Sequence, residues 1–105
     1  VEKSAGCAEY YADNGAQFLA AETLASDASH SYVKYQPLGT VLGILPWNAP
    51  VWLALRFMAP ALMAGNTCIM KADPNVPRTA VALIAAFDNH VQQAQLILLY
   101  LLHSM

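Results

Sequence analysis

The sequence has few charged side chains and no cluster of them. Of its 105 residues, 11% are Asp, Glu, Lys or Arg, and 5 basic side chains stand against 7 acidic ones. Proteins that bind nucleic acids or anionic membrane surfaces carry grouped Lys and Arg side chains, which this chain does not have. We therefore expect no nucleic acid and no membrane surface among its partners.

Long apolar runs, paired cysteines and metal-ligand clusters are also missing. After Arg78 the longest strongly apolar run is residues 96–102, far short of the roughly 20 residues that span a bilayer. Cys7 and Cys68 lack Cys-x-x-Cys spacing, and no histidine is spaced to share a metal with a second ligand. We predict free buried thiols in a reducing cytoplasm, no transmembrane segment and no metal.

The sequence also lacks the glycine-rich loop of standard dinucleotide-binding folds. Gly39 and Gly43 flank an apolar run instead of opening a helix. A chain of this length forms one small domain. Any nucleotide site must therefore use other residues within a single core.

The first third of the chain predicts a helix followed by an extended segment. Residues 1–21 are rich in Ala, Glu, Gln and Leu and place apolar side chains on one helical stripe. Asn14-Gly15 leaves open a bend or an early helix end. Residues 22–30 are polar and predict a surface connection, and residues 31–36 predict a strand that stops at Pro37.

The middle of the chain predicts a strand, a helix and a second strand. Residues 40–45 are apolar on both faces, which is typical of a parallel strand covered on both sides. Residues 50–64 predict a helix that begins at Pro50, is kinked or restarted near Pro60, and is capped by Gly65. Residues 66–71 predict the second strand, parallel to the first.

The last part of the chain predicts a helix over residues 79–89, starting near Pro77, and then a change of character. The predicted fold class is therefore α/β. It is a partial Rossmann-like cofactor-binding domain over residues 1–89, made of a helix, an arm strand, a βαβ unit and a helix. Residues 90–105 are predicted to be an atypical apolar, helical tail.

Two short segments follow the two central strands. In open α/β sheets ligands bind beyond the carboxyl ends of the strands, where Pro46-Trp47-Asn48 and Lys71-Ala72-Asp73-Pro74 are placed. An amide at such a turn can donate a hydrogen bond to a developing oxyanion, and loss of one such donor costs about 2.7–4 kcal/mol. Asn48 is the candidate, although an Asn here could instead cap the following helix.

These segments resemble the aldehyde dehydrogenase superfamily. Residues 37–50 read PLGTVLGILPWNAP and residues 61–71 read ALMAGNTCIMK, and the Gln-Pro-Leu-Gly before the strand is similar to that of succinate-semialdehyde dehydrogenase-like members. The resemblance covers residues 1–89, as an N-terminal internal fragment of a longer cytoplasmic oxidoreductase. It implies oxidation of an aldehyde, with succinate semialdehyde as the leading candidate, to the acid with NAD(P).

The resemblance also implies residue roles. It assigns Asn48 to the catalytic oxyanion site and Lys71 to the cofactor's adenosine ribose or phosphate. The other residues implied at the cofactor are Pro46, Trp47, Asn48 itself, Ala72, Asp73 and Pro74.

Position 74 bears on the choice between NADP and NAD. The family often has an acidic residue there, where this chain has Pro74. A carboxylate would repel a 2′-phosphate, so its absence favours NADP over NAD.

Other features of the family limit what this chain can do. The family's catalytic cysteine and general-base glutamate have no counterpart here, so we expect the chain alone to be inactive. The strand over residues 31–36 corresponds to an arm that helps build the family's homo-oligomers. The alternative is a non-enzymatic, self-associating interaction module, or a pseudogene remnant, with exposed strand edges and an apolar C-terminus.

Overall fold

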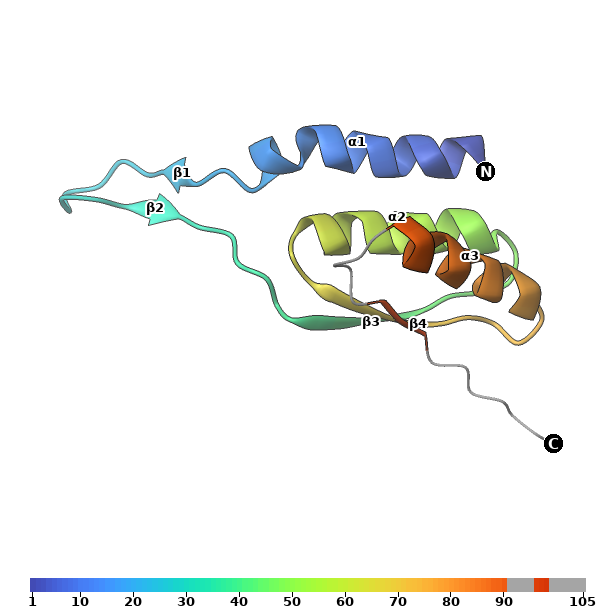
Figure 1. The fold of residues 1–105 in the computed structure, drawn as a ribbon. Coiled ribbons are helices and arrows are strands. Elements are labelled where there is room, and N and C mark those ends of the chain that lie inside the picture. The colour runs from blue at the N-terminus through green and yellow to red at the C-terminus, as the bar shows by residue number, and fades with distance from the viewer. Residues whose placement is uncertain (91–95, 99–105) are drawn as a thin grey trace.

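The computed structural model describes residues 1–90 and 96–98 of the chain. The elements follow in the order α1 (Glu2–Phe18), β1 (Glu22–Thr23), β2 (Tyr32–Val33), β3 (Thr40–Ile44), α2 (Pro50–Met63), β4 (Thr67–Lys71), α3 (Pro77–His90) and β5 (Leu96–Leu98). Helix α1 lies on α2, and α2 and α3 lie on the sheet (Figure 1). The molecule is elongated, 62 × 30 × 27 Å, because the β1–β2 arm extends from this body.

The central sheet is parallel and has the strand order β3-β4-β5. The βαβ unit predicted from the sequence is confirmed, with Thr40 opposite Thr67 at one end of the pair and Ile44 opposite Lys71 at the other. Each pair of opposed residues shares a face of the sheet, so the register decides which side chains lie together.

The prediction of a helical C-terminal tail is wrong for residues 96–98. These residues form β5, which pairs with Cys68 to Met70 of β4. The free edge of β4 presents backbone N–H and C=O groups, and a third parallel strand supplies their partners. This long-range pairing overrides the local composition from which the helix was predicted. The rest of the predicted tail, 91–95 and 99–105, lies outside the described residues.

Helix α2 begins and ends as the sequence predicts. Pro50 occupies the first turn, where its missing N–H has no helical partner. At the other end Gly65 adopts a φ of +84°. The Gly65 N–H donates to the Leu62 carbonyl at 2.9 Å, and the Asn66 N–H donates to the Ala61 carbonyl at 3.0 Å. This pair of bonds is a Schellman motif. The helix continues through Pro60 without a restart.

The core lies between α2, α3 and one face of the sheet. Its buried members come from the helices and from β4: Ala54, Met58, Cys68, Met70 and Leu83.

Glycine at position 43 allows α2 to approach β3 closely, because a Cβ there would lie 2.6 Å from the Phe57 ring. The same relation holds between α1 and α2, where a Cβ on Gly15 would lie 2.6 Å from Met63. Helix α1 continues through Asn14-Gly15 to Phe18, so the predicted alternative of a helix end at this pair is wrong.

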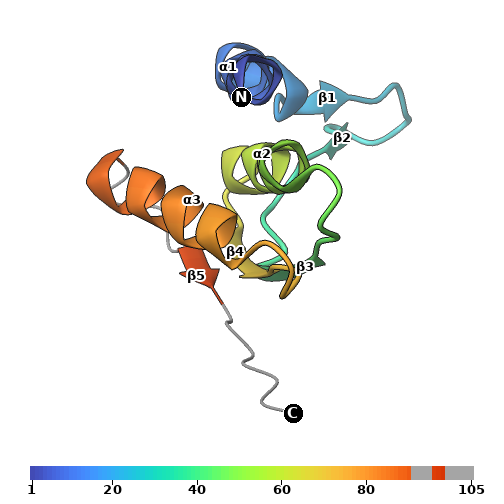
Figure 2. The same ribbon diagram turned by 90° about the vertical axis from the view of Figure 1, so that its right-hand side faces the viewer.

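The expectation that β3 is covered on both faces is wrong. Leu42 is 56% exposed and Ile44 is 69% exposed, whereas Gly43 between them is buried. All three helices lie on the same side of the sheet, with α1 stacked on α2 and not on the opposite face (Figure 2). The apolar residues on both faces of β3 therefore identify the strand but not how many of its faces are covered.

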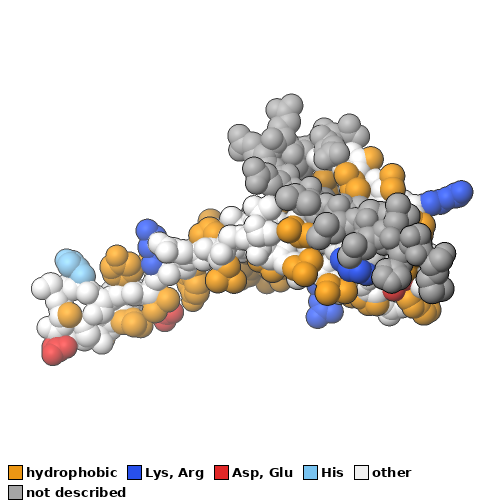
Figure 3. Space-filling model, turned by 90° about the horizontal axis from the view of Figure 1, so that it is seen from below, with side chains coloured by type: hydrophobic (Ala, Val, Ile, Leu, Met, Phe, Trp, Pro, Cys, Tyr) orange, Lys and Arg blue, Asp and Glu red, His pale blue; other side chains and the backbone are white. Residues whose placement is uncertain are grey.

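The arm contains a short antiparallel pair. Glu22 lies opposite Val33, and Thr23 lies opposite Tyr32. The predicted strand over residues 31–36 is present only as Tyr32–Val33, and its partner β1 lies within the predicted surface connection. Two-residue strands are too short to show an alternating pattern in the sequence. Hydrophobic side chains are exposed along this arm (Figure 3).

Candidate cofactor and active site

The carboxyl ends of β3 and β4 lie side by side. Ile44 pairs with Lys71, and the Leu45 N–H donates to the Lys71 carbonyl at 3.0 Å. The segments that follow therefore leave the sheet at the same edge, the one formed by the carboxyl ends of the strands. These segments are Pro46-Trp47-Asn48 and Ala72-Asp73-Pro74. This is the position at which open α/β sheets bind ligands.

Lys71 lies on the open face of the sheet. The register places it beside Ile44, which is 69% exposed and belongs to the face that no described helix covers. Lys71 is itself partly buried, and a lysine in such a place buries its methylenes and keeps its ammonium in water. A cation in this position can meet a phosphate or a ribose hydroxyl that approaches from the open side.

Asn48 does not cap the helix that follows it. The N-cap of α2 is Ala49, and no side chain makes a capping hydrogen bond there. Asn48 is exposed, and Trp47 beside it is 59% exposed. The amide of Asn48 is therefore not used to begin α2, which leaves its N–H groups free to face a bound molecule.

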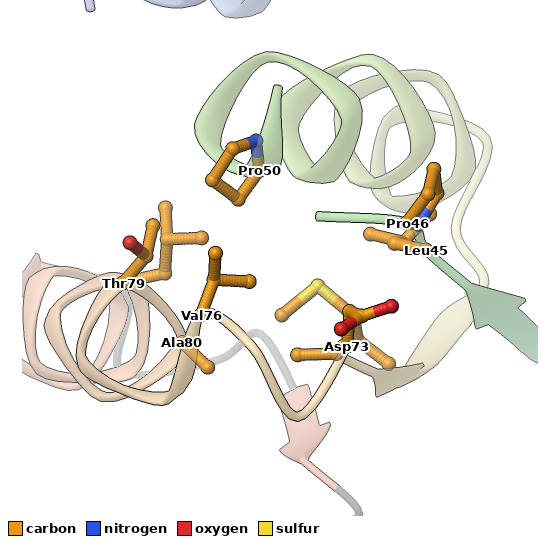
Figure 4. Close-up of a pocket in the computed structure, with 10 residues that line it drawn as sticks. Leu45, Pro46, Pro50, Asp73, Val76, Thr79 and Ala80 are labelled. Atoms are coloured by element: carbon orange, nitrogen blue, oxygen red, sulfur yellow. The ribbon is translucent and has the colours of Figure 1, made fainter. Parts of the chain in front are cut away.

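The other predicted cofactor residues lie on the helix side of the same edge. Pro46, Ala72 and Asp73 line a pocket together with Leu45, Pro50, Met70, Val76, Thr79, Ala80 and Leu83 (Figure 4). The cavity has a volume of only about 10 Å³, which is room for about one water molecule. A dinucleotide is too large for this pocket, so it would have to extend across the open edge where Trp47, Asn48 and Lys71 lie.

Asp73 has a local structural role. Its Oδ1 accepts hydrogen bonds from the backbone N–H of Asn75 at 2.9 Å and from the Asn75 side chain at 2.8 Å. The Val76 N–H donates to the Asp73 carbonyl at 3.1 Å. These bonds form an Asx turn that leads from β4 into α3. One carboxylate oxygen of Asp73 thus stabilises the loop that carries Pro74, which is exposed.

Neither cysteine is placed to act as a nucleophile at this edge. Cys68 is buried in the core on β4, and Cys7 lies on α1. Burial raises the pKa of the Cys68 thiol, so the neutral form persists at physiological pH. Within residues 1–90 and 96–98, no three His, Cys, Asp or Glu side chains are grouped as a metal site would require. The helices among these residues are too short or too polar to cross a membrane.

Sequence reasoning missed one residue that connects distant parts of this unit. The sequence pattern predicted Asn66 only as the first residue of a strand. Its side chain accepts hydrogen bonds from the N–H groups of Leu38 and Gly39 and donates one to the Ala61 carbonyl. The Gly65-Asn66 pair signals a helix end in the sequence. Nothing in the sequence pattern indicates the contact with residues almost thirty positions earlier.

Comparison with known proteins places this arrangement in a family. The model of the aldehyde dehydrogenase family matches residues 1–98, so the match extends past residue 89 and includes β5. A probable NADP-dependent succinate-semialdehyde dehydrogenase of Synechocystis sp. is 47% identical over 88 residues, which cover 84% of this chain and 19% of the relative. An NADP-dependent succinate-semialdehyde dehydrogenase of Mycobacterium ulcerans is 52% identical over 86 residues, which cover 79% of this chain and 19% of that protein.

A solved structure agrees with these sequence matches. Succinic semialdehyde dehydrogenase from Streptococcus pyogenes, in complex with NADP⁺, superposes with a TM-score of 0.86 and 28% identity over 95% of this chain and 22% of that protein. The chain thus spans about a fifth of the length of the relatives that it matches. The predicted resemblance is confirmed by sequence and by fold, and the chain belongs to the aldehyde dehydrogenase family.

Proposed function

We propose that this chain supplies part of the cofactor and substrate site of an NADP-dependent aldehyde dehydrogenase that oxidises succinate semialdehyde. The relatives from Synechocystis sp. and Mycobacterium ulcerans are both described as NADP-dependent succinate-semialdehyde dehydrogenases. The observation that carries the proposal is the pairing of Ile44 with Lys71. It sets a cation and the exposed Trp47-Asn48 turn at the same open edge.

Lys71 and its surroundings fit the phosphorylated cofactor. A lysine ammonium donates up to three hydrogen bonds and carries a full positive charge, which suits ribose hydroxyls and a 2′-phosphate. Pro74 is exposed near this edge and brings no negative charge. The carboxylate of Asp73 lines the pocket on the helix side, whereas Lys71 lies opposite Ile44 on the open face. NADP is therefore preferred over NAD, which lacks the 2′-phosphate.

Asn48 would act on the substrate oxygen. When bound, the nicotinamide supplies the chemistry of hydride acceptance. The Asn48 amide donates a hydrogen bond to the aldehyde oxygen, where negative charge develops when a nucleophile attacks the carbonyl. This chain has no counterpart of the family's nucleophilic cysteine or general-base glutamate. The proposed contribution of these residues is therefore binding and orientation.

Calorimetric titration of the purified chain with NADP and NAD tests the proposal. We expect NADP to bind more tightly than NAD, and Lys71→Ala to weaken NADP binding by about 10- to 150-fold, since a hydrogen bond to a charged group contributes roughly 1.5–3 kcal/mol. Lys34→Ala is the matched control, because Lys34 is exposed and follows β2 on the arm. Equal affinity of wild type and Lys71→Ala, or no binding of either nucleotide, would contradict the proposal.

A second candidate function is self-association without catalysis. It is favoured by the exposed side chains of Leu42 and Ile44 on the open face, where Ile44 lies opposite Lys71, and by the exposed Trp47 after the strand. Exposed apolar patches and unpaired strand edges favour association with other chains. The arm, with exposed Tyr32 and further apolar side chains, is a second contact surface and the proposed element of oligomer formation in the intact enzyme.

Sedimentation velocity separates the two functions. Replacement of both Leu42 and Ile44 by Ser should shift a self-associating chain toward monomer. The free energy of unfolding should stay within about 0.5 kcal/mol of wild type, as is usual for surface positions. If the double substitution leaves the oligomer unchanged, the open face does not mediate self-association. If the chain also binds no nucleotide, the open face is not a cofactor site either.

A further inference from the structure

We propose that Asn66 is a positioning residue for the candidate site. Its side chain sets the register of β3 against β4 at their amino ends, and this register in turn places Lys71 beside the Pro46-Trp47-Asn48 segment at the carboxyl ends. The inference depends on the proposed function only for its nucleotide readout, because the register itself can be measured without nucleotide.

One amide group joins three segments of the chain. The Asn66 Oδ1 accepts hydrogen bonds from the Leu38 N–H at 2.7 Å and from the Gly39 N–H at 3.1 Å. The Asn66 Nδ2 donates to the Ala61 carbonyl at 3.1 Å. The segment before β3, the end of α2 and the start of β4 are therefore connected through one side chain. An amide carries its two-lone-pair acceptor and its donor on two separate atoms, which can meet different segments, whereas a hydroxyl has both on one atom and an ionised carboxylate has no donor.

Backbone contacts hold the same place, which we call the amino-end junction (residues 37–39 and 65–67). The Thr67 N–H donates to the Gly39 carbonyl at 2.8 Å. Gly65 has a φ of +84°, and a Cβ on it would lie 2.9 Å from the Pro37 ring. The turn at Gly65 therefore brings the chain against Pro37 and leaves the Asn66 side chain at the backbone of residues 38 and 39.

The register determines what the carboxyl ends present. A slip of one residue moves a strand by about 3.3 Å and turns every side chain to the opposite face. With β4 shifted in this way, Lys71 would no longer pair with Ile44 and would leave the open face. The Leu45 N–H would also lose the Lys71 carbonyl, to which it is now bonded at 3.0 Å. Asn66 opposes such a slip because its two acceptor bonds go to the consecutive N–H groups of Leu38 and Gly39, immediately before β3.

Three variants of the full chain test this role. Asn66→Ala removes both halves of the contact. Asn66→Asp keeps the acceptor for Leu38 and Gly39 but cannot donate to Ala61. Asn14→Ala is the matched control, because the Asn14 side chain also donates to a backbone carbonyl, that of Tyr10 at 2.8 Å, but within a single helix.

Two quantities are measured for each variant: the hydrogen-exchange rate of the Leu45 amide without nucleotide, and the dissociation constant for NADP. Both are measured under conditions in which circular dichroism shows the variant to be folded. For Asn66→Ala we expect exchange of Leu45 to be about tenfold faster and NADP binding about tenfold weaker, the change that the loss of about one net hydrogen bond would produce. Asn66→Asp should melt at a lower temperature and yet match wild type in both readouts within about threefold, because it retains the two acceptor bonds. Asn14→Ala should match wild type.

Several results would overturn the proposal. An Asn66→Ala protein with wild-type Leu45 exchange and NADP affinity would show that Asn66 contributes stability and nothing more. If Asn66→Ala does not fold, the Asn66→Asp variant decides. Protection of the Leu38 and Gly39 amides from exchange would show that the two acceptor bonds are kept. If the Leu45 amide of that variant nevertheless exchanged about tenfold faster than in wild type, the two bonds would not hold the register, and the proposal would be wrong. If wild type binds no NADP, the proposed function fails, and the exchange measurement still decides the role of Asn66.

Discussion

The two faces of the central sheet are formed by alternate residues of the same strands, and their surroundings differ completely. On the covered face Gly43 lies opposite Met70, both are buried, and Phe57 of α2 packs over the glycine. On the open face Ile44 lies opposite Lys71, and Ile44 is 69% exposed. Close packing confers stability on the first face, whereas the second presents side chains to whatever binds there. The same register thus supplies both the core and the candidate site.

This difference predicts that truncation of a core side chain has by far the larger effect on stability. Met58 is 0% exposed and packs in the core, so Met58→Ala should lower the free energy of unfolding by about 2–5 kcal/mol through lost burial and the cavity left behind. Ile44→Ala on the open face should cost less than about 0.5 kcal/mol. Urea unfolding measures both. Similar losses in the two variants would show that the open face is covered in solution.

The close approach of α2 to β3 gives a second, smaller effect. Gly43→Ala should cost about 1–3 kcal/mol, because the new methyl group meets the Phe57 ring at 2.6 Å and the helix must move. Gly6→Ala is the matched control, since a Cβ at Gly6 meets nothing within 4 Å. It should raise stability by up to about 1 kcal/mol, the difference in helix propensity between the two residues.

A double-mutant cycle identifies the cause of the Gly43 effect. Phe57→Leu removes the ring, so Gly43→Ala should be less destabilising in a Phe57→Leu background. Additive effects of the two substitutions would mean that the cost arises elsewhere, for example from the backbone of β3.

The smallest expected effect concerns the pH dependence of the covered face. Burial raises the pKa of the Cys68 thiol above its ordinary value in the unfolded chain, 9.0. The unfolded state therefore loses its proton first as the pH rises. The buried neutral thiol contributes its full share of the free energy of unfolding at pH values below the pKa of the unfolded chain. This contribution is lost progressively as the pH rises toward the higher pKa of the folded protein.

Thermal unfolding measured between neutral pH and pH 10 tests this linkage. The alkaline decline should be smaller in Cys68→Ser, because burial raises the pKa of the Cys68 thiol. Cys7→Ser, at the other free cysteine, is the control and should keep the decline of wild type. A decline of the same size in all three proteins would assign it to other groups.

Local signals were sufficient to predict the long elements. A Pro at the start of α2 and a Gly after its end mark boundaries for reasons that lie within the residues themselves, namely a missing N–H and a tolerated positive φ. The short apolar runs of β3 and β4 lie on either side of this helix, so the parallel pair followed from the connection between them. The motifs in the same region were specific enough to indicate the family and to select Asn48 and Lys71 as candidates.

Other features could not be predicted from local pattern. The tail was predicted to be helical because its residues are compatible with a helix, whereas β5 forms because the edge of β4 offers backbone partners. Strand β1 is too short to have a pattern, and the contact of Asn66 with Leu38 joins residues that are distant in sequence.

The sequence by itself determined the family, the order of strand, helix and strand, and the residue types at the carboxyl ends of the strands. Only the tertiary structure decided that all three helices lie on one face, that Lys71 shares the open face with Ile44, and that Pro46, Ala72 and Asp73 line a separate pocket. The physical reason is that helix propensity and turn chemistry act between near neighbours. Register, face and burial depend on contacts between segments that the fold alone brings together.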